Sequence, residues 1–85
     1  MDDHLILGIH VTDRVQRANE VQGVLSEYGH VIKTRVGLHD VHGDHCTPGG
    51  LILLEIHGEA AIVTELRERL SRIVGVEVQQ MAFRH

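Results

Sequence analysis

The segment from residue 39 to residue 46 concentrates side chains that bind transition metals. Its sequence, His-Asp-Val-His-Gly-Asp-His-Cys, holds three histidines, one cysteine and two aspartates in eight consecutive positions. Imidazole and thiolate are the ligands preferred by Zn²⁺, Ni²⁺, Co²⁺ and copper ions. The pattern therefore predicts a transition-metal site that could hold any of these ions, zinc and nickel included.

His10 joins the candidate ligands through the expected topology. It lies near the end of the first apolar segment, residues 5–11. In the sheet predicted below, that end lies beside the histidine-rich segment, and Asp13 follows closely. The predicted metal ligands are therefore drawn from one set, to which a neighbouring subunit can contribute a member: His10, His39, His42, His45 and Cys46. The alternative is a histidine-rich polar turn, because no zinc-finger spacing, Cys-x-x-Cys or His-Glu-x-x-His is present.

Catalysis has little support in the sequence. There is no Ser-His-Asp arrangement, no paired-carboxylate pattern and no phosphate-cradling glycine loop. Cys46 as a nucleophile or redox sensor would need a fixed base or a resolving cysteine, and neither is evident. Residues 21–24, Val-Gln-Gly-Val, resemble part of the acylphosphatase signature but stand inside a predicted helix. We predict a protein that is not an enzyme.

Hydrophobic periodicity predicts a small α+β domain. Apolar, β-branched or alternating runs predict strands over residues 5–11, 31–38, 51–57 and 76–83. Apolar residues at three- and four-residue steps predict helices over 15–28 and 62–74. Residues 39–50 are expected to form a loop, because Gly43, Pro48, Gly49 and Gly50 interrupt regular structure there.

The order of these segments defines the expected fold. A β-α-β-β-α-β sequence is the ferredoxin-like plan, with an antiparallel sheet in the order 4-1-3-2 and both helices on one face. With 85 residues, the chain has room for a single domain spanning 1–85.

The second face of the expected sheet predicts self-association. The two central strands are apolar on both sides, whereas a face open to water should alternate with polar residues. The simplest account is a homo-oligomer, a dimer or a tetramer, that packs through its sheets. The alternative is a monomer with an exposed apolar face, which is uncommon among soluble proteins.

Composition excludes several partners and compartments. A net charge of −4 and the absence of aromatic residues on the central strands argue against direct nucleic-acid binding. The longest uninterrupted apolar run, residues 51–54, is far too short to cross a membrane. The acidic start Met1-Asp2-Asp3 and a single cysteine favour the cytoplasm.

Four short motifs resemble those of a known family. They are Ile-His-Val-Thr-Asp-Arg at 9–14, Leu-Ser-Glu-Tyr-Gly at 25–29, Arg-Val-Gly-Leu at 35–38 and Gly-Val-Glu-Val at 75–78. Together they resemble the small ACT-like proteins called iron-only hydrogenase system regulators. The resemblance implies a stand-alone, oligomeric ferredoxin-like domain with a regulatory role and a protein partner in a regulatory system. Family members have a proline soon after Arg-Val-Gly and a short turn, whereas His39 and a longer connection follow here.

The histidine-rich segment is similar to that of a second group, the C-terminal sensor domain of nickel-responsive transcription regulators. There the metal site uses histidines at the end of the second strand and a cysteine ahead of the third, and His39, His42 and Cys46 occupy similar positions. The spacing here is His-x-x-His in place of His-x-His, and the DNA-binding segment is absent. This resemblance implies nickel as the ion. The resulting prediction is a regulatory metal sensor; the alternative is a metal-free ACT-like module that binds a small-molecule effector or a protein.

Overall fold

The computed structural model describes residues 4–12, 14–42 and 45–84, with the side chains of these ranges except those of 14–16, 39–42 and 45–49. The expected β-α-β-β-α-β order is confirmed, with a short 3₁₀ helix ahead of the second strand. The elements are β1 (His4–Val11), α1 (Arg14–Glu27), η1 (Gly29–Val31), β2 (Ile32–His42), β3 (His45–Ile56), α2 (Ala60–Ser71) and β4 (Val76–Phe83).

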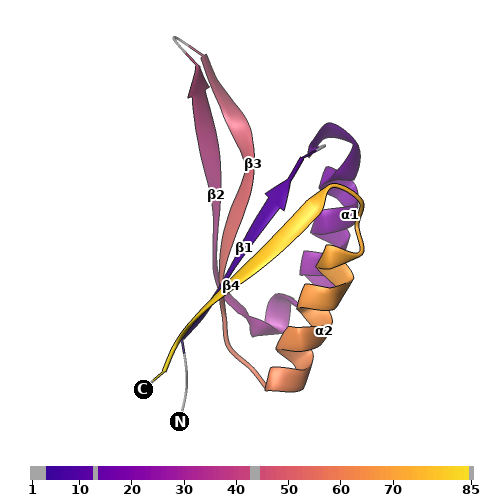
Figure 1. Cartoon of the computed structure of the whole chain (residues 1–85), viewed down its shortest axis with the longest axis vertical. Coiled ribbons are helices and arrows are strands. Elements are labelled where there is room, and N and C mark those ends of the chain that lie inside the picture. Colours follow the sequence, from indigo (N-terminus) through magenta and orange to yellow (C-terminus); the bar gives the residue numbers. More distant parts are fainter. Residues whose placement is uncertain (1–3, 13, 43–44, 85) are drawn as a thin grey trace.

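The four strands form one antiparallel sheet in the order β2-β3-β1-β4. Read from the other edge, this order is β4-β1-β3-β2. Both helices lie on the same side of the sheet, which leaves its other face without a covering layer (Figure 1). The α+β class and the antiparallel sheet predicted from the sequence are therefore confirmed.

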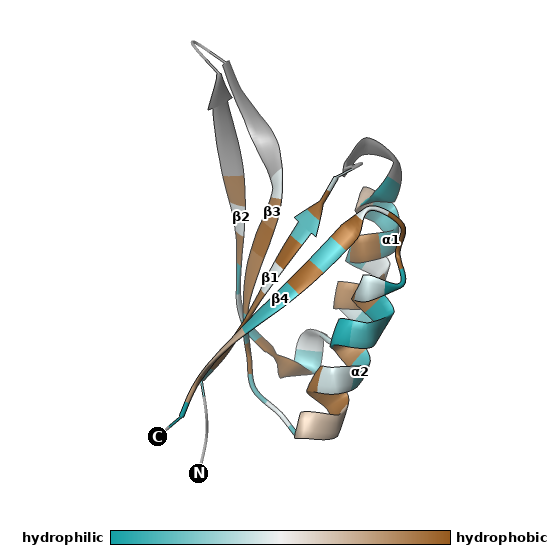
Figure 2. Cartoon of the chain, viewed as in Figure 1, coloured by the Kyte–Doolittle hydropathy of each residue, from teal (hydrophilic) through white to brown (hydrophobic). Residues whose placement is uncertain are grey.

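The core lies between the helices and the sheet. Leu7 and Ile9 of β1 are fully buried, while Ile6 and Gly8, which alternate with them, are only half-buried because they face the other side of the sheet. Figure 2 shows apolar residues on both the strands and the helices. The remaining fully buried large side chains come from β3, α2 and α1, namely Leu54, Ile56, Leu66, Leu70 and Val21. Each such burial contributes about 1.5–3 kcal/mol before ordering costs.

The expected loop over residues 39–50 is wrong. β2 continues to His42 and β3 begins at His45, and their backbones pair from His39 opposite Pro48 to His42 opposite His45. We call residues 39–42 and 45–49 the β-arm; its paired part is residues 39–42 and 45–48. It projects beyond the end of β1, as Figure 1 shows.

Pro48 is tolerated in the β-arm because β3 has a neighbouring strand on only one side there. β3 pairs with β1 only as far as Leu51, opposite His10, so the part of β3 that contains Pro48 pairs with β2 alone. One edge of β3 is therefore without a neighbouring strand there, and a missing N–H on that edge breaks no ladder bond. A register irregularity between Leu38 and His39 marks the base of the arm.

The end of α2 agrees with the sequence less closely. The apolar stripe predicted a helix to residue 74, but α2 ends at Ser71, and a turn leads to Gly75 at a φ of 83°. Positive φ favours glycine, which explains the residue at this turn. β4 follows at once over the predicted range. Among the described residues, no helix has the length and hydropathy needed to cross a membrane.

Candidate functional site: the open face of the sheet

The structure separates the predicted metal ligands into two places. His10 lies on β1 with an exposed side chain. The backbones of His39, His42, His45 and Cys46 belong to the β-arm, where His42 is opposite His45 and Val41 is opposite Cys46. The side chains of these four residues lie outside those that the structure describes, as does all of Asp13.

The register places His10 at the base of the β-arm. His10 pairs with Leu51, and His45 stands six positions further along β3. At the usual rise of a strand, this separation corresponds to roughly 20 Å. His10 and the end of the β-arm therefore lie in separate parts of the folded chain.

The face of the sheet opposite the helices, which we call the open face, is apolar at its centre. Cross-strand pairs define its rows, because directly paired residues share a face. Gly8 pairs with Leu53 of β3 and Gln79 of β4, and Leu53 pairs in turn with Val36. Several large apolar side chains of this face are strongly exposed, at 45% for Val36, 39% for Leu38 and 56% for Met81.

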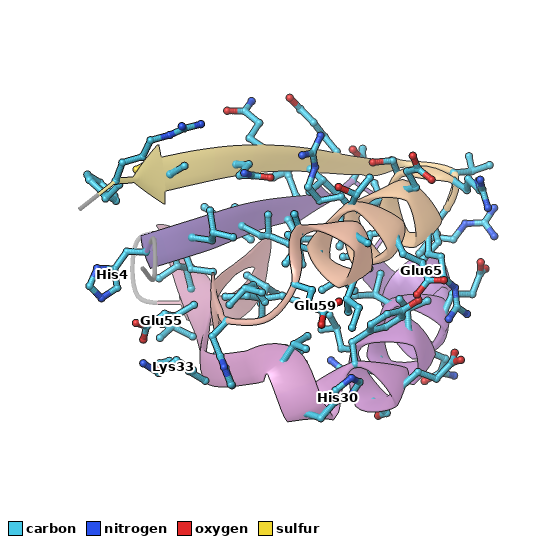
Figure 3. The ribbon with its side chains drawn as sticks, turned by 90° about the horizontal axis from the view of Figure 1, so that it is seen from below. His4, His30, Lys33, Glu55, Glu59 and Glu65 are labelled. Atoms are coloured by element: carbon cyan, nitrogen blue, oxygen red, sulfur yellow. The ribbon has the colours of Figure 1, made fainter. Side chains whose placement is uncertain are left out.

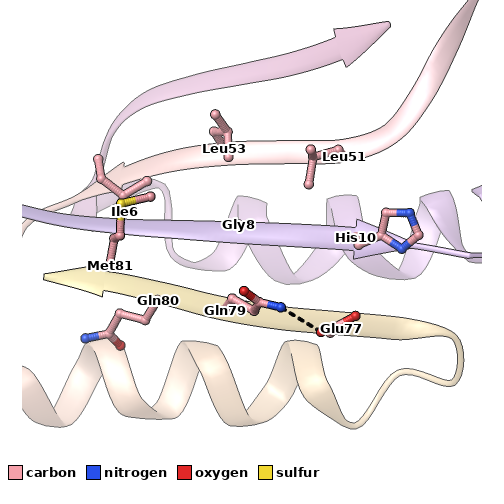
Figure 4. Close-up of a pocket in the computed structure, with 9 residues that line it drawn as sticks. All are labelled: Ile6, Gly8, His10, Leu51, Leu53, Glu77, Gln79, Gln80 and Met81. Atoms are coloured by element: carbon pink, nitrogen blue, oxygen red, sulfur yellow. Dashed lines mark hydrogen bonds between the residues drawn. The ribbon is translucent and has the colours of Figure 1, made fainter. Parts of the chain in front are cut away.

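A hollow of about 300 Å³ lies over Gly8 on the open face. Gly8 has no side chain, so the space between its neighbours on β3 and β4 stays empty (Figure 4). The apolar lining comes from Ile6, Leu51, Leu53 and Met81.

One wall of the hollow is polar. His10 of β1 pairs with Glu77 of β4, and both line the hollow together with Gln79. The Gln79 amide donates a hydrogen bond from Nε2 to Glu77 Oε2 over 2.8 Å, drawn as a dashed line in Figure 4. This bond fixes the Glu77 carboxylate relative to β4.

A separate charged cluster surrounds Glu55 (Figure 3). Glu55 Oε2 lies 3.9 Å from His4 Nε2 and 4.0 Å from Lys33 Nζ. Its Oε1 accepts a hydrogen bond from Thr34 Oγ1 over 3.0 Å. Glu55 is paired with Ile6 of β1, two residues before Gly8, so this cluster lies on the same face as the hollow.

A third cluster joins the two helices, and its hydrogen bonds change the pKa values of its own side chains. The Tyr28 hydroxyl donates to Glu65 Oε2 over 2.7 Å, and this bond raises the pKa of Tyr28. Arg69 donates two hydrogen bonds to Glu27, of 2.9 and 2.8 Å, which lower the pKa of Glu27 and raise that of Arg69. The Arg69 guanidinium also stands over the Tyr28 ring, 5.6 Å from its centroid. These contacts connect α1 to α2.

Among the side chains that the structure describes, no three histidine, cysteine or acidic groups come together in a way that could hold a metal ion. The sequence analysis did not identify the hollow or its polar wall. A signal for it was present, because Glu77 and Gln79 alternate with Val76 and Val78 along a predicted strand.

Comparison with known proteins supports the fold. No family model and no curated protein matches the chain. A similar solved structure is that of an uncharacterized protein, TM1266, from Thermotoga maritima, with a TM-score of 0.80 and 25% sequence identity. The match covers 99% of this chain and 100% of that one, so the two share the arrangement of the whole domain.

Proposed function

We propose that this protein is a non-enzymatic regulatory domain of the ferredoxin-like, ACT-like type that acts in the cytoplasm and associates with copies of itself through the open face. The observation that carries the proposal is the row of uncovered aliphatic side chains on this face, Val36, Leu53 and their neighbours. The element order and the strand order support the ferredoxin-like assignment. The short motifs described above support the ACT-like one.

A two-fold dimer is the simplest assembly that would cover the open face. The same patch then serves on both subunits, and the apolar residues of each copy bury those of the other. Each Å² of apolar surface removed from water contributes about 25 cal/mol, against which the entropic cost of association must be set. A tetramer would need a second patch, and the exposed edge of β2 is available for it.

Sedimentation velocity over a range of protein concentrations tests this proposal. We expect mass to rise with concentration in the unmodified protein and to stay that of a monomer in Leu53→Asp, which places a charge at the centre of the open face. Val74→Asp is the matched control, because Val74 is 71% exposed and lies in the turn after α2. A monomer at every concentration, or equal association of both variants, would contradict self-association through this face.

A second candidate function, the binding of nickel or zinc, is favoured by the register of the β-arm. His42 and His45 are opposite one another in the backbone ladder, and Cys46 is adjacent to His45. Paired positions of an antiparallel ladder are close enough for two imidazoles to reach one ion. His39 stands nearer the base of the arm, and His10, roughly 20 Å from its end, would complete the site only from another copy.

Equilibrium dialysis against Ni²⁺ or Zn²⁺, followed by metal analysis of untagged protein, tests the metal proposal. We expect close to one equivalent per chain, lost in His42→Ala and His45→Ala and retained in His30→Ala, an exposed histidine of η1. Affinity should fall on acidification because the ligands must be deprotonated. Stoichiometric binding that all three variants retain would place the ion outside the β-arm, and no binding at all would remove the metal from the proposal. A metal-free module that binds an effector or a protein partner would then be the better account.

A further inference from the structure

The hollow over Gly8 combines an apolar lining with a carboxylate side chain. Ile6, Leu51 and Leu53 form the apolar part, and Glu77 supplies the carboxylate. The volume of the hollow, about 300 Å³, is at the lower end of the range of small-molecule sites. We infer that this hollow binds a small aliphatic amine, with the alkyl chain over Gly8 and the ammonium group against Glu77.

Glu77 lacks a cationic partner in the part of the chain that the structure describes. The carboxylates of Glu20, Glu27 and Glu55 each lie within 4.0 Å of a basic side chain. Glu77 receives only the amide hydrogen bond from Gln79, which carries no charge. A carboxylate beside an apolar surface gains more from a cation than one in open water, because water screens the attraction less there.

Glu77 and Gln79 leave free acceptors in the polar wall. The Gln79 amide nitrogen is directed to Glu77, which leaves Gln79 Oε1 and the second Glu77 oxygen as acceptors. An ammonium group has three N–H donors and no acceptor, so it complements this pair. A carboxylate or phosphate ligand would meet the charge of Glu77 and is disfavoured.

The inferred site lies on the face that we propose for self-association. Amine binding and self-association can nevertheless be tested separately. Both properties use Leu53 of β3, but only amine binding depends on the Glu77 carboxylate of β4. Glu77→Gln therefore tests the amine site without removing an apolar side chain from the face. An amine bound there is a candidate effector of assembly, and only this last statement depends on the proposed function.

NMR titration with n-hexylammonium tests the inference, with n-hexanol and n-hexanoate as probes of equal chain length. The titration is made at about pH 8.5, where an alkylammonium keeps its charge. We expect the backbone amide signals of Gly8, Leu53 and Gln79 to shift with the ammonium and much less with the alcohol or the carboxylate. The titration is made at two protein concentrations, so that self-association is monitored in the same samples.

Three variants decide the outcome. Glu77→Gln should weaken binding about tenfold or more. Gly8→Leu should abolish it by filling the hollow, and a β-carbon at Gly8 fits because it would meet only Leu53 Cδ2, at 3.7 Å. Glu68→Gln, at an exposed position of α2, should bind like the unmodified protein.

Three results would overturn the inference: equal shifts with hexanol, unchanged affinity in Glu77→Gln, or no shift at either protein concentration. The proposed self-association survives any of these, because it is measured by mass in the absence of the amine. A protein that stays monomeric but binds the amine would contradict self-association and support the site.

Discussion

Gly50 of β3 passes so close to Val11 of β1 that a β-carbon at position 50 would overlap the Val11 carbonyl oxygen. The contact lies where β1 ends and the β-arm leaves the sheet. Only a residue without a side chain allows the two backbones to approach in this way. The position explains one of the glycines that the sequence analysis assigned to a loop.

Gly50→Ala should therefore destabilise the protein by about 2 kcal/mol, the usual cost of forcing an extra carbon into an occupied place. Gly37→Ala is the matched control, because Gly37 is also in a strand but has open space around it. Urea unfolding followed by circular dichroism measures both. Equal stability of the two variants would show that β3 moves away from Val11 at little cost.

Leu53 and Leu54 are neighbours in β3 but face opposite sides of the sheet. Leu54 is fully buried under the helices, whereas Leu53 lines the hollow on the open face. Leu54→Ala should lower the free energy of unfolding by about 3 kcal/mol because it leaves a cavity. Leu53→Ala should cost about 1 kcal/mol in the monomer, since only part of its surface is removed from water. Urea unfolding at low protein concentration compares them, and a larger loss for Leu53→Ala would contradict the assignment of faces.

Tyr28 is the single tyrosine of the chain, so its ionisation can be followed directly by ultraviolet absorbance. Its hydroxyl donates to Glu65, which favours the protonated phenol and raises its pKa above the ordinary value near 10. We expect the pH at the midpoint of the absorbance change to be lower in Glu65→Ala and unchanged in Glu68→Ala, which alters a neighbouring residue on α2. An unchanged midpoint in Glu65→Ala would show that the bond is absent in solution.

The same bond predicts a loss of stability at alkaline pH. Because the pKa of Tyr28 is higher in the folded state, its contribution is complete below the unfolded pKa and is lost as pH rises through the folded one. The melting temperature should therefore fall more steeply with rising alkaline pH in the unmodified protein than in Tyr28→Phe. Parallel declines would assign the alkaline loss to other groups.

Glu27 predicts the opposite behaviour in acid. The two hydrogen bonds from Arg69 lower its pKa below the unfolded value of 4.5. Its contribution is therefore present above pH 4.5 and is lost as pH falls through the lower, folded value. A double-mutant cycle of Glu27→Gln and Arg69→Met should give a coupling energy at neutral pH that disappears in strong acid. A coupling energy that persists there would point to packing of the Arg69 stem, with the charge contributing little.

The sequence predicted the regular elements because their hydrophobic periods are plain. The last strand was predicted over its observed range, Val76–Phe83, and the first to within one residue of His4–Val11. The β-arm was missed because Pro48 and three glycines normally interrupt a strand. At this place β3 has a neighbour on one side only, and the close approach at Val11 requires glycine.

The candidate site was harder to predict than the fold. That the open face is apolar followed from Leu51, Leu53 and Ile6, which share it in the observed register. The hollow could not be predicted from the sequence. It forms because Leu53 and Gln79, from strands far apart in the sequence, flank Gly8. Pairing of distant strands is fixed by the whole fold and is not encoded in any short segment.

The β-arm also determines how the molecule moves through solvent. The domain measures 45 × 25 × 18 Å along its principal axes, so it is far from spherical. An elongated particle meets more friction than a sphere of equal mass and leaves a gel-filtration column early. A single protomer will therefore elute at a volume that suggests a larger species, and only methods that weigh the particle, such as light scattering, will report its subunit number.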